Sequence, residues 1–190
     1  MHLHGLTKSK PDTIYLNHEQ APRPQNTLLD QKRIDMAFRS HQRKSQNKIN
    51  FGDINICTVN GMNTNQLGVI SKTVTFENYP KAKVRMTNLE RTLIDIAVRP
   101  AYSGGTDTVI EAYIAARDLV QASDLLDTLT NLRYVYPYHQ AIGYYLENAD
   151  YPSTQVDLFR QIPRNYDFYL THQIKHPKHI KEWNIYVPDN

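Results

Sequence analysis

The sequence has very little cysteine and no long apolar run. Cys57 is the only cysteine in 190 residues, which excludes an internal disulfide and any zinc site built from several thiolates. No stretch of about 18 apolar residues occurs, so we expect no membrane-spanning helix and no membrane partner. Residues 1–7 lack the charged start and apolar centre of a signal peptide. Together these absences predict a cytoplasmic protein.

The motifs of common enzyme classes are absent as well. There is no glycine-rich phosphate loop and no nucleophile elbow. A metal-dependent nuclease is the enzymatic alternative, and it would need acidic residues that converge on one sheet edge. Asp30 and Lys32 have the acidic-x-Lys spacing of such enzymes but lie at a predicted helix start, and Asp53 lies on or between strands with no acidic-x-Lys motif at a following strand. We therefore expect a protein that is not an enzyme and has no cofactor or metal.

Three histidines near the C-terminus could suggest a metal site. His172, His176 and His179 lie close together in the sequence. Pro177 prevents a continuous helix that would carry them on one face, and carboxylates are sparse nearby. A polar surface loop is the interpretation that we prefer for this segment.

Positive charge is concentrated in the first 50 residues. The whole chain has a net charge of +3, and residues 1–50 alone carry nine basic and four acidic side chains. Residues 29–43 have a helical apolar pattern with Ile34 and Phe38 facing inward. A basic stripe on and after this helix could contact nucleic-acid phosphates or an acidic partner surface, although a solvated helix face has the same composition. Its members are Lys32, Arg33, Arg39, Arg43 and Lys44.

Tyrosines crowd one later region. Tyr134, Tyr136 and Tyr138 alternate there, and three more follow by residue 151. Tyrosine is enriched at protein interfaces because it offers a large contact area with a polar tip, but half-buried core edges have it too. These three tyrosines are therefore interface candidates, and a plain protein–protein interaction module remains a third alternative.

The order of the elements predicts an α+β fold in a single domain, residues 1–190. We expect a mixed β-sheet from the N-terminal half, covered by a helical C-terminal half, with late strands near the C-terminus. The expected divisions are a basic segment and helix (1–50), strands (51–86), helices (87–160) and tail strands (161–190). Individual strands are expected at 13–17, 48–59, 68–76, 82–86, 166–170 and 183–187, with turns at Gly52-Asp53 and Asn60-Gly61.

The stretch 86–105 has the clearest local organisation. Thr87 and Glu90 have capping-box spacing, and the apolar face that follows predicts a helix docked on the preceding strands. Arg91 and Asp95 lie one turn apart and can form an ion pair. Arg99-Pro100 ends the helix, and 103–105 is a turn before the next one.

This stretch resembles the C-terminal domain of the AbiEi family. The similarity extends in order to 4–16, to the helix around 34–39 and to Ala141-Ile-Gly-Tyr-Tyr-Leu-Glu147. AbiEi proteins are antitoxins and transcriptional regulators of type IV toxin–antitoxin and abortive-infection systems, which defend bacteria against phage. The resemblance implies a toxin partner similar to a nucleotidyltransferase, not necessarily in a stable complex. Met1 lies where this domain begins, so we expect the antitoxin domain without the family's usual DNA-binding winged helix.

Overall fold

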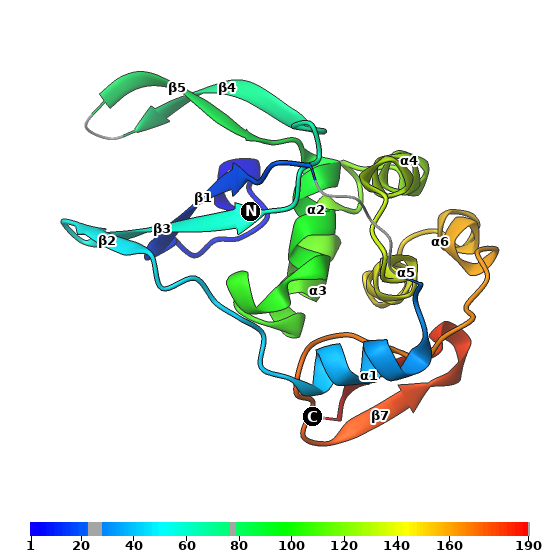
Figure 1. Cartoon of the computed structure of the whole chain (residues 1–190). Helices are drawn as coiled ribbons and strands as arrows, with labels where there is room; N and C mark the ends of the chain where they lie inside the picture. The colour runs from blue at the N-terminus through cyan, green and yellow to red at the C-terminus, as the bar shows by residue number, and fades with distance from the viewer. Residues whose placement is uncertain (23–27, 77–78, 190) are drawn as a thin grey trace.

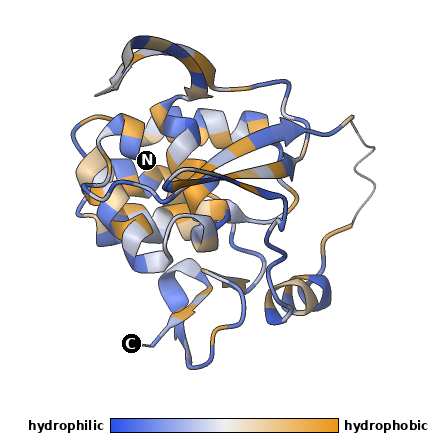
Figure 2. Cartoon of the chain, turned by 90° about the vertical axis from the view of Figure 1, so that its left-hand side faces the viewer, coloured by the Kyte–Doolittle hydropathy of each residue, from blue (hydrophilic) through white to orange (hydrophobic). Residues whose placement is uncertain are grey.

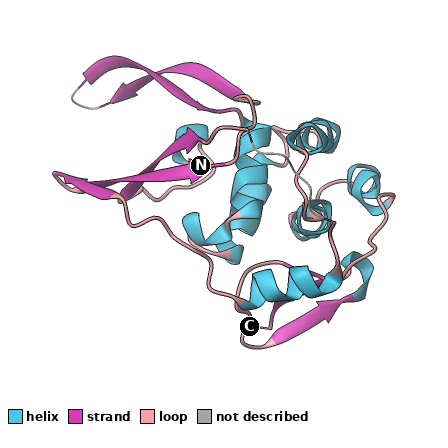
Figure 3. Ribbon diagram, viewed as in Figure 1, coloured by secondary structure: helices cyan, strands magenta, loops and turns pink. Residues whose placement is uncertain are grey.

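The chain has an α+β fold. The computed structural model describes residues 1–22, 28–76 and 79–189, and these form three small sheets and six α-helices (Figures 1 and 3). The elements of the N-terminal half are β1 (Thr13–Glu19), α1 (Gln31–Arg39), β2 (Lys48–Phe51), β3 (Ile54–Gly61), β4 (Val69–Phe76) and β5 (Tyr79–Thr87). Those that follow are α2 (Leu89–Val98), α3 (Thr106–Ala116), α4 (Ala122–Leu132), α5 (Tyr138–Asn148), α6 (Ser153–Arg160), β6 (Phe168–Tyr169), β7 (Pro177–Ile180) and β8 (Ile185–Pro188).

The first sheet is mixed, in the order β1-β3-β2. β1 runs parallel to β3, and β2 pairs with β3 through the expected turn, where Gly52 has a φ of 59°. The turn expected at Asn60-Gly61 is wrong, because β3 continues to Gly61, which pairs with Glu19. The long parallel partner β1 provides ladder positions for both residues, so the turn propensity of the dipeptide is overridden.

Strands β4 and β5 form a sheet of their own, so the N-terminal strands are divided between two sheets. The loop between β3 and β4 turns the chain away, with Asn65, Gln66 and Gly68 at positive φ. The carboxylate of Glu19 accepts hydrogen bonds from the backbone N–H groups of Thr64 and Gln66 and fixes this turn (both 3.2 Å). In Figure 1 the resulting hairpin extends away from the helices.

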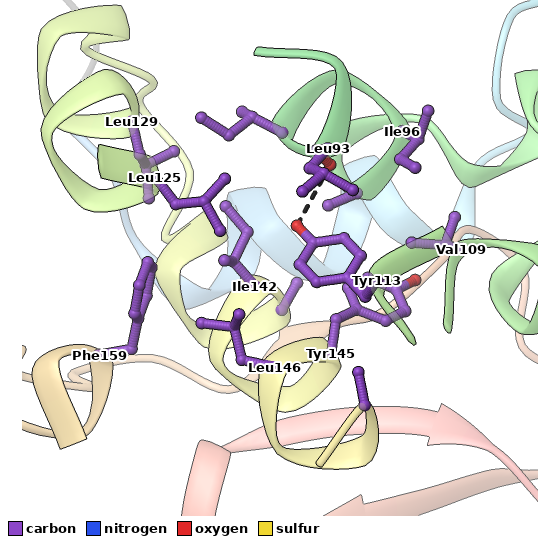
Figure 4. Close-up of a cluster of buried hydrophobic side chains, with 14 of the residues drawn as sticks. Leu93, Ile96, Val109, Tyr113, Leu125, Leu129, Ile142, Tyr145, Leu146 and Phe159 are labelled. Atoms are coloured by element: carbon purple, nitrogen blue, oxygen red, sulfur yellow. Dashed lines mark hydrogen bonds between the residues drawn. The ribbon is translucent and has the colours of Figure 1, made fainter. Parts of the chain in front are cut away.

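Helix α2 lies in the middle of the helical half and packs mainly on α3, α4 and α5, not on the preceding strands. Figure 4 shows part of this core, where the hydroxyl of Tyr113 donates a hydrogen bond to the carbonyl of Leu93 (3.2 Å). The expected capping box is wrong, because Asn88 caps the helix and accepts from the N–H of Arg91 (3.0 Å). Thr87 is the last residue of β5, so its backbone is committed to the ladder.

The third sheet, in the order β6-β8-β7, joins the C-terminus to the helices. Trp183 is fully buried and packs on α5 at Gly143. The side-chain amide of Gln140 donates to the carbonyls of Trp183 (2.7 Å) and Asn184 (2.9 Å). The expected loop around the histidines instead contains β7, and Pro177 is tolerated because it is the first residue of an edge strand.

Candidate partner surface on helix α1

Helix α1 is shorter than the predicted 29–43. Asp30 is its N-cap and accepts a hydrogen bond from the N–H of Arg33 (2.8 Å), and Ile34 and Phe38 are buried as expected. The helix ends at Arg39 because residues of the C-terminal segment form hydrogen bonds with the last backbone carbonyl groups of the helix and its cap. The N–H of Gln173 donates to the carbonyl of Phe38 (2.8 Å), and the His172 ring contacts the carbonyl of Ser40 (3.2 Å).

The structure divides the predicted basic stripe into two groups. Lys32, Arg33 and Arg39 are exposed on α1, whereas Arg43 and Lys44 are exposed in the extended segment that leads to β2. Within α1, Arg33 lies 3.8 Å from Asp30 and Arg39 lies 3.9 Å from Asp35. Exposed ion pairs of this kind contribute at most about 1 kcal/mol. The two arginines can therefore exchange these partners for an external anion at little cost.

The third sheet holds α1 in place. The side-chain amide of Gln31 donates to the carbonyl of Asp167 and accepts from its N–H, both at 2.9 Å. One turn later, the hydroxyl of Tyr169 donates to Asp35 (3.1 Å). Burial, and then this bond to Asp35, raise the pKa of Tyr169. These bonds give the exposed face of α1 a fixed orientation.

A hollow of about 440 Å³ lies where the end of α1 meets the third sheet. It is lined by Phe38, Arg39, Tyr169, Gln173, Ile174, Lys175, Pro177 and Tyr186. The rings of Tyr169 and Tyr186 are stacked on one another with centroids 5.1 Å apart, and Phe38 also stacks with Tyr169 at 5.6 Å. Arg39 and Lys175 are exposed, so the hollow combines aromatic rings with two cations. The two cations favour a negatively charged group.

Sequence reasoning missed Lys175, Tyr169 and Tyr186 as site residues. They lie about 130–150 residues after Arg39, and no spacing motif links them to α1. The alternation in 183–187 predicted a strand that includes Tyr186, but not its position beside α1.

The three candidate tyrosines are half-buried and differ in surroundings. Tyr134 and Tyr136 line a second hollow of about 270 Å³, together with Leu29, Val135, Pro137, His139, Pro163, Asn165 and Tyr166. Tyr138 packs edge-on against Phe168 with centroids 5.3 Å apart. Burial raises the pKa of Tyr138, and it raises that of Tyr134 to about 12. Tyr134 and Tyr136 thus retain a place at the surface, whereas Tyr138 mainly joins α5 to the third sheet.

The residues of the 86–105 stretch point inward. The predicted pair of Arg91 and Asp95 is confirmed at 2.8 Å, but Arg91 is buried and also donates to the carbonyl of Leu67 (2.9 Å). Burial raises the pKa of Asp95, and the Arg91 charge opposes that shift. In Glu19, which holds the same loop, burial would raise the pKa, but bonds from Thr64 and Gln66 outweigh it and lower the pKa. This network fixes the loop between β3 and β4 on α2.

The residues considered for metal chemistry lie apart. Asp53 is exposed in the β2–β3 turn, and His179 is 3.0 Å from Asp167. Over residues 1–22, 28–76 and 79–189, the structure has no group of three histidine, cysteine or acidic residues arranged to hold a metal ion. In the same residues, no helix combines the length and apolar character needed to cross a membrane.

Comparison with known proteins gave no match to a family model, to a curated protein or to a solved structure.

Proposed function

We propose that this chain is the antitoxin domain of a type IV toxin–antitoxin system, and that it acts in the cytoplasm against a nucleotidyltransferase-like toxin. In this proposal it is not an enzyme and uses no cofactor. The observation that carries the proposal is the ordered resemblance of four separate segments to AbiEi proteins, centred on residues 86–105.

The packing of those segments supports treating the resemblance as one unit. Each of the four contributes to a single buried core, with Leu6, Ile34, Leu93 and Ile142 as examples. At their junction, the ring of His4 lies 2.8 Å from the carbonyl of Thr87, which directly precedes the cap of α2. Segments up to about 140 residues apart thus depend on one another for their packing. A change that unfolds one of them would disturb the other three.

The exposed face of α1 and the hollow at its end are the surface that we assign to this function. Arg39 and Lys175 are the cations closest to the hollow, and Arg33 lies on the exposed face of the same helix. We propose that these side chains engage anionic groups of the toxin or of the nucleic acid on which a nucleotidyltransferase would act. A supporting role in transcriptional autoregulation would place cations of this chain on DNA phosphates.

Coexpression tests the proposal. The gene adjacent to that of this chain is induced in bacteria, with and without the chain. We expect the gene to arrest growth and the chain to restore it. An arrest that the chain leaves unchanged, although it accumulates in folded form, would remove the antitoxin assignment.

Paired variants test the surface. Arg39→Glu with Lys175→Glu should reduce the rescue, because two cations beside the hollow are reversed. Lys8→Glu with Lys10→Glu is the matched control, since both lysines are exposed near the N-terminus and the charge change is equal. Equal rescue by the two pairs would show that α1 is not the relevant surface. Circular dichroism of each variant checks that the helices are intact.

A further inference from the structure

The β4–β5 hairpin is a two-stranded ribbon that stands largely free of the body (Figure 1). Its two strands make their extensive contacts with each other, and the links to the rest of the chain are few. Near its base, Lys72 donates to the carbonyl of Leu3 (3.1 Å) and Arg85 donates to the side chain of Gln66. A two-stranded hairpin without further packing is only marginally stable. Contact with an external ligand would therefore stabilise a hairpin that projects in this way.

The register gives the hairpin two different faces. Lys83 pairs with Thr73 and Arg85 pairs with Ser71, so these four side chains share one face. Lys81 lies beyond this regular pairing, where the register shifts at a β-bulge. All five are exposed. The other face carries Lys72 and apolar side chains, most of them half-buried, although Ile70 is exposed. The bond of Lys72 to Leu3 shows that this face is turned toward the body. Polar and apolar residues accordingly alternate along the hairpin in Figure 2.

The outward face is rich in groups that bind phosphate, although Val69 also lies on it at the base of the hairpin. It offers three cations and two hydroxyls, and no acidic residue occurs in the described parts of the hairpin, 69–76 and 79–87. Glu77 lies outside the described residues. Hydroxyl, lysine and arginine side chains are the usual partners of phosphate oxygens in protein–DNA complexes.

The spacing of the cations fits a nucleic-acid backbone. Alternate side chains on a strand are about 6.8 Å apart, which equals about two nucleotide steps along one DNA strand. The major groove of B-DNA is about 12 Å wide and admits a two-stranded ribbon. The deep and narrow major groove of duplex RNA does not admit one.

We propose that the outward face of this hairpin binds the phosphate backbone of duplex DNA without reading its sequence. Lys81 and Lys83 act as point charges on phosphates about two nucleotide steps apart, and Ser71 and Thr73 donate hydroxyl hydrogen bonds beside them. Arg85, whose guanidinium is also bound to Gln66, anchors the ribbon near its base. This activity is separate from the antitoxin function and does not depend on α1.

Fluorescence anisotropy of the full chain with a labelled DNA duplex tests the proposal. The variant Lys81→Gln/Lys83→Gln/Arg85→Gln removes three charges but leaves exposed positions polar. For three phosphate contacts, the slope of log affinity against log salt should become shallower by about 2.7, so the wild-type chain loses about 40-fold more affinity than the variant between 50 and 200 mM salt. Lys81→Arg/Lys83→Arg/Arg85→Lys should retain the wild-type slope.

The matched control is Lys8→Gln/Lys10→Gln/Lys178→Gln, which removes three exposed lysines far along the chain from the hairpin. It should keep the wild-type slope. An equal loss in this control would reduce the binding to an effect of net charge and overturn the proposal, as would an unchanged slope in the hairpin variant. A duplex RNA of the same length should bind more weakly, and equal affinity would overturn the assignment to duplex DNA.

The growth-rescue assay separates this proposal from the proposed function. The hairpin variant should lose DNA binding and still rescue growth, whereas the Arg39/Lys175 variant should lose rescue and still bind DNA. Loss of both activities in the hairpin variant, with its circular dichroism unchanged, would contradict their separation.

Discussion

Replacing Gly143 by alanine tests how the C-terminal segment is held on the helical half. Gly143 lies inside α5, where a Cβ atom would be 2.1 Å from one ring carbon of Trp183 and 2.4 Å from another. Both residues are fully buried, so the indole cannot move aside without displacing its neighbours. The indole N–H also donates to Glu147 (2.7 Å), so a displaced ring gives up this bond.

The expected magnitude comes from three terms of different sign. In a helix without tertiary contacts, alanine would stabilise relative to glycine by about 1 kcal/mol. Overpacking a dense core costs about 1–3 kcal/mol. Losing a hydrogen bond to a carboxylate costs about 1.5–3 kcal/mol. The two costs outweigh the gain, so Gly143→Ala should lower the free energy of unfolding by about 2–4 kcal/mol.

Two measurements check this expectation. Denaturant unfolding gives the change in free energy. Because Trp183 is the only tryptophan, the native fluorescence spectrum reports its surroundings, and the emission of Gly143→Ala should shift to the red. Ser123→Ala, an exposed substitution in α4, is the control for helix propensity alone. A Gly143→Ala variant that is as stable as wild type, with unchanged emission, would refute the packing described for Trp183.

Three further predictions concern stability. Leu93→Ala should cost about 2–5 kcal/mol by denaturant unfolding, because the side chain is completely buried; a loss below about 1 kcal/mol would contradict that burial. The lowered pKa of Glu19 stabilises the fold above the unfolded-state pKa, and this contribution is lost as the pH falls through the folded value, so Glu19→Gln should flatten the acid limb of stability against pH. Burial raises the pKa of Tyr113 and Tyr134, so the free energy of unfolding should fall above pH ~10 as unfolded tyrosines ionise, and less steeply in Tyr134→Phe.

Local patterns predicted much of the fold. The apolar spacing of Ile34 and Phe38 and the turn at Gly52 both depend on neighbours within a few residues, and the structure confirms them. The signals that failed were overridden by distant partners. Asn60-Gly61 continues as a strand because β1 supplies a ladder partner, and α1 stops early because Gln173 and His172 occupy its final carbonyls.

The burial of Arg91 shows why a site cannot be read from such patterns alone. Its spacing from Asp95 predicted the ion pair but not the burial of Arg91. Arg91 is buried because Leu67 and Thr64, more than 20 residues upstream, supply further acceptors. The hollow beside α1 could not be predicted from the sequence either. Arg39 and Lys175 line it together only because the third sheet packs beside α1.

The net charge of the chain beyond residue 50 gave no indication of the cationic hairpin. Residues 51–190 have a small net negative charge, so only the first 50 residues were predicted to be basic. Acidic residues of that part lie mostly in and around the helices, whereas 79–87 contains three cations and no acid. The period of two in Lys81, Lys83 and Arg85 was visible in the sequence, but only the register with Ser71 and Thr73 shows that they form one exposed face.

The segment that best indicates the family is therefore a poor place to test the function. Arg91 and Leu93 are buried, so substitutions there act first on stability, and a lost rescue in such a variant would not separate unfolding from a lost contact. Arg39, Lys175, Lys81 and Lys83 are exposed, and substitutions at exposed positions usually change stability by less than about 0.5 kcal/mol. Lost rescue or lost DNA binding in those variants would report on the contact itself.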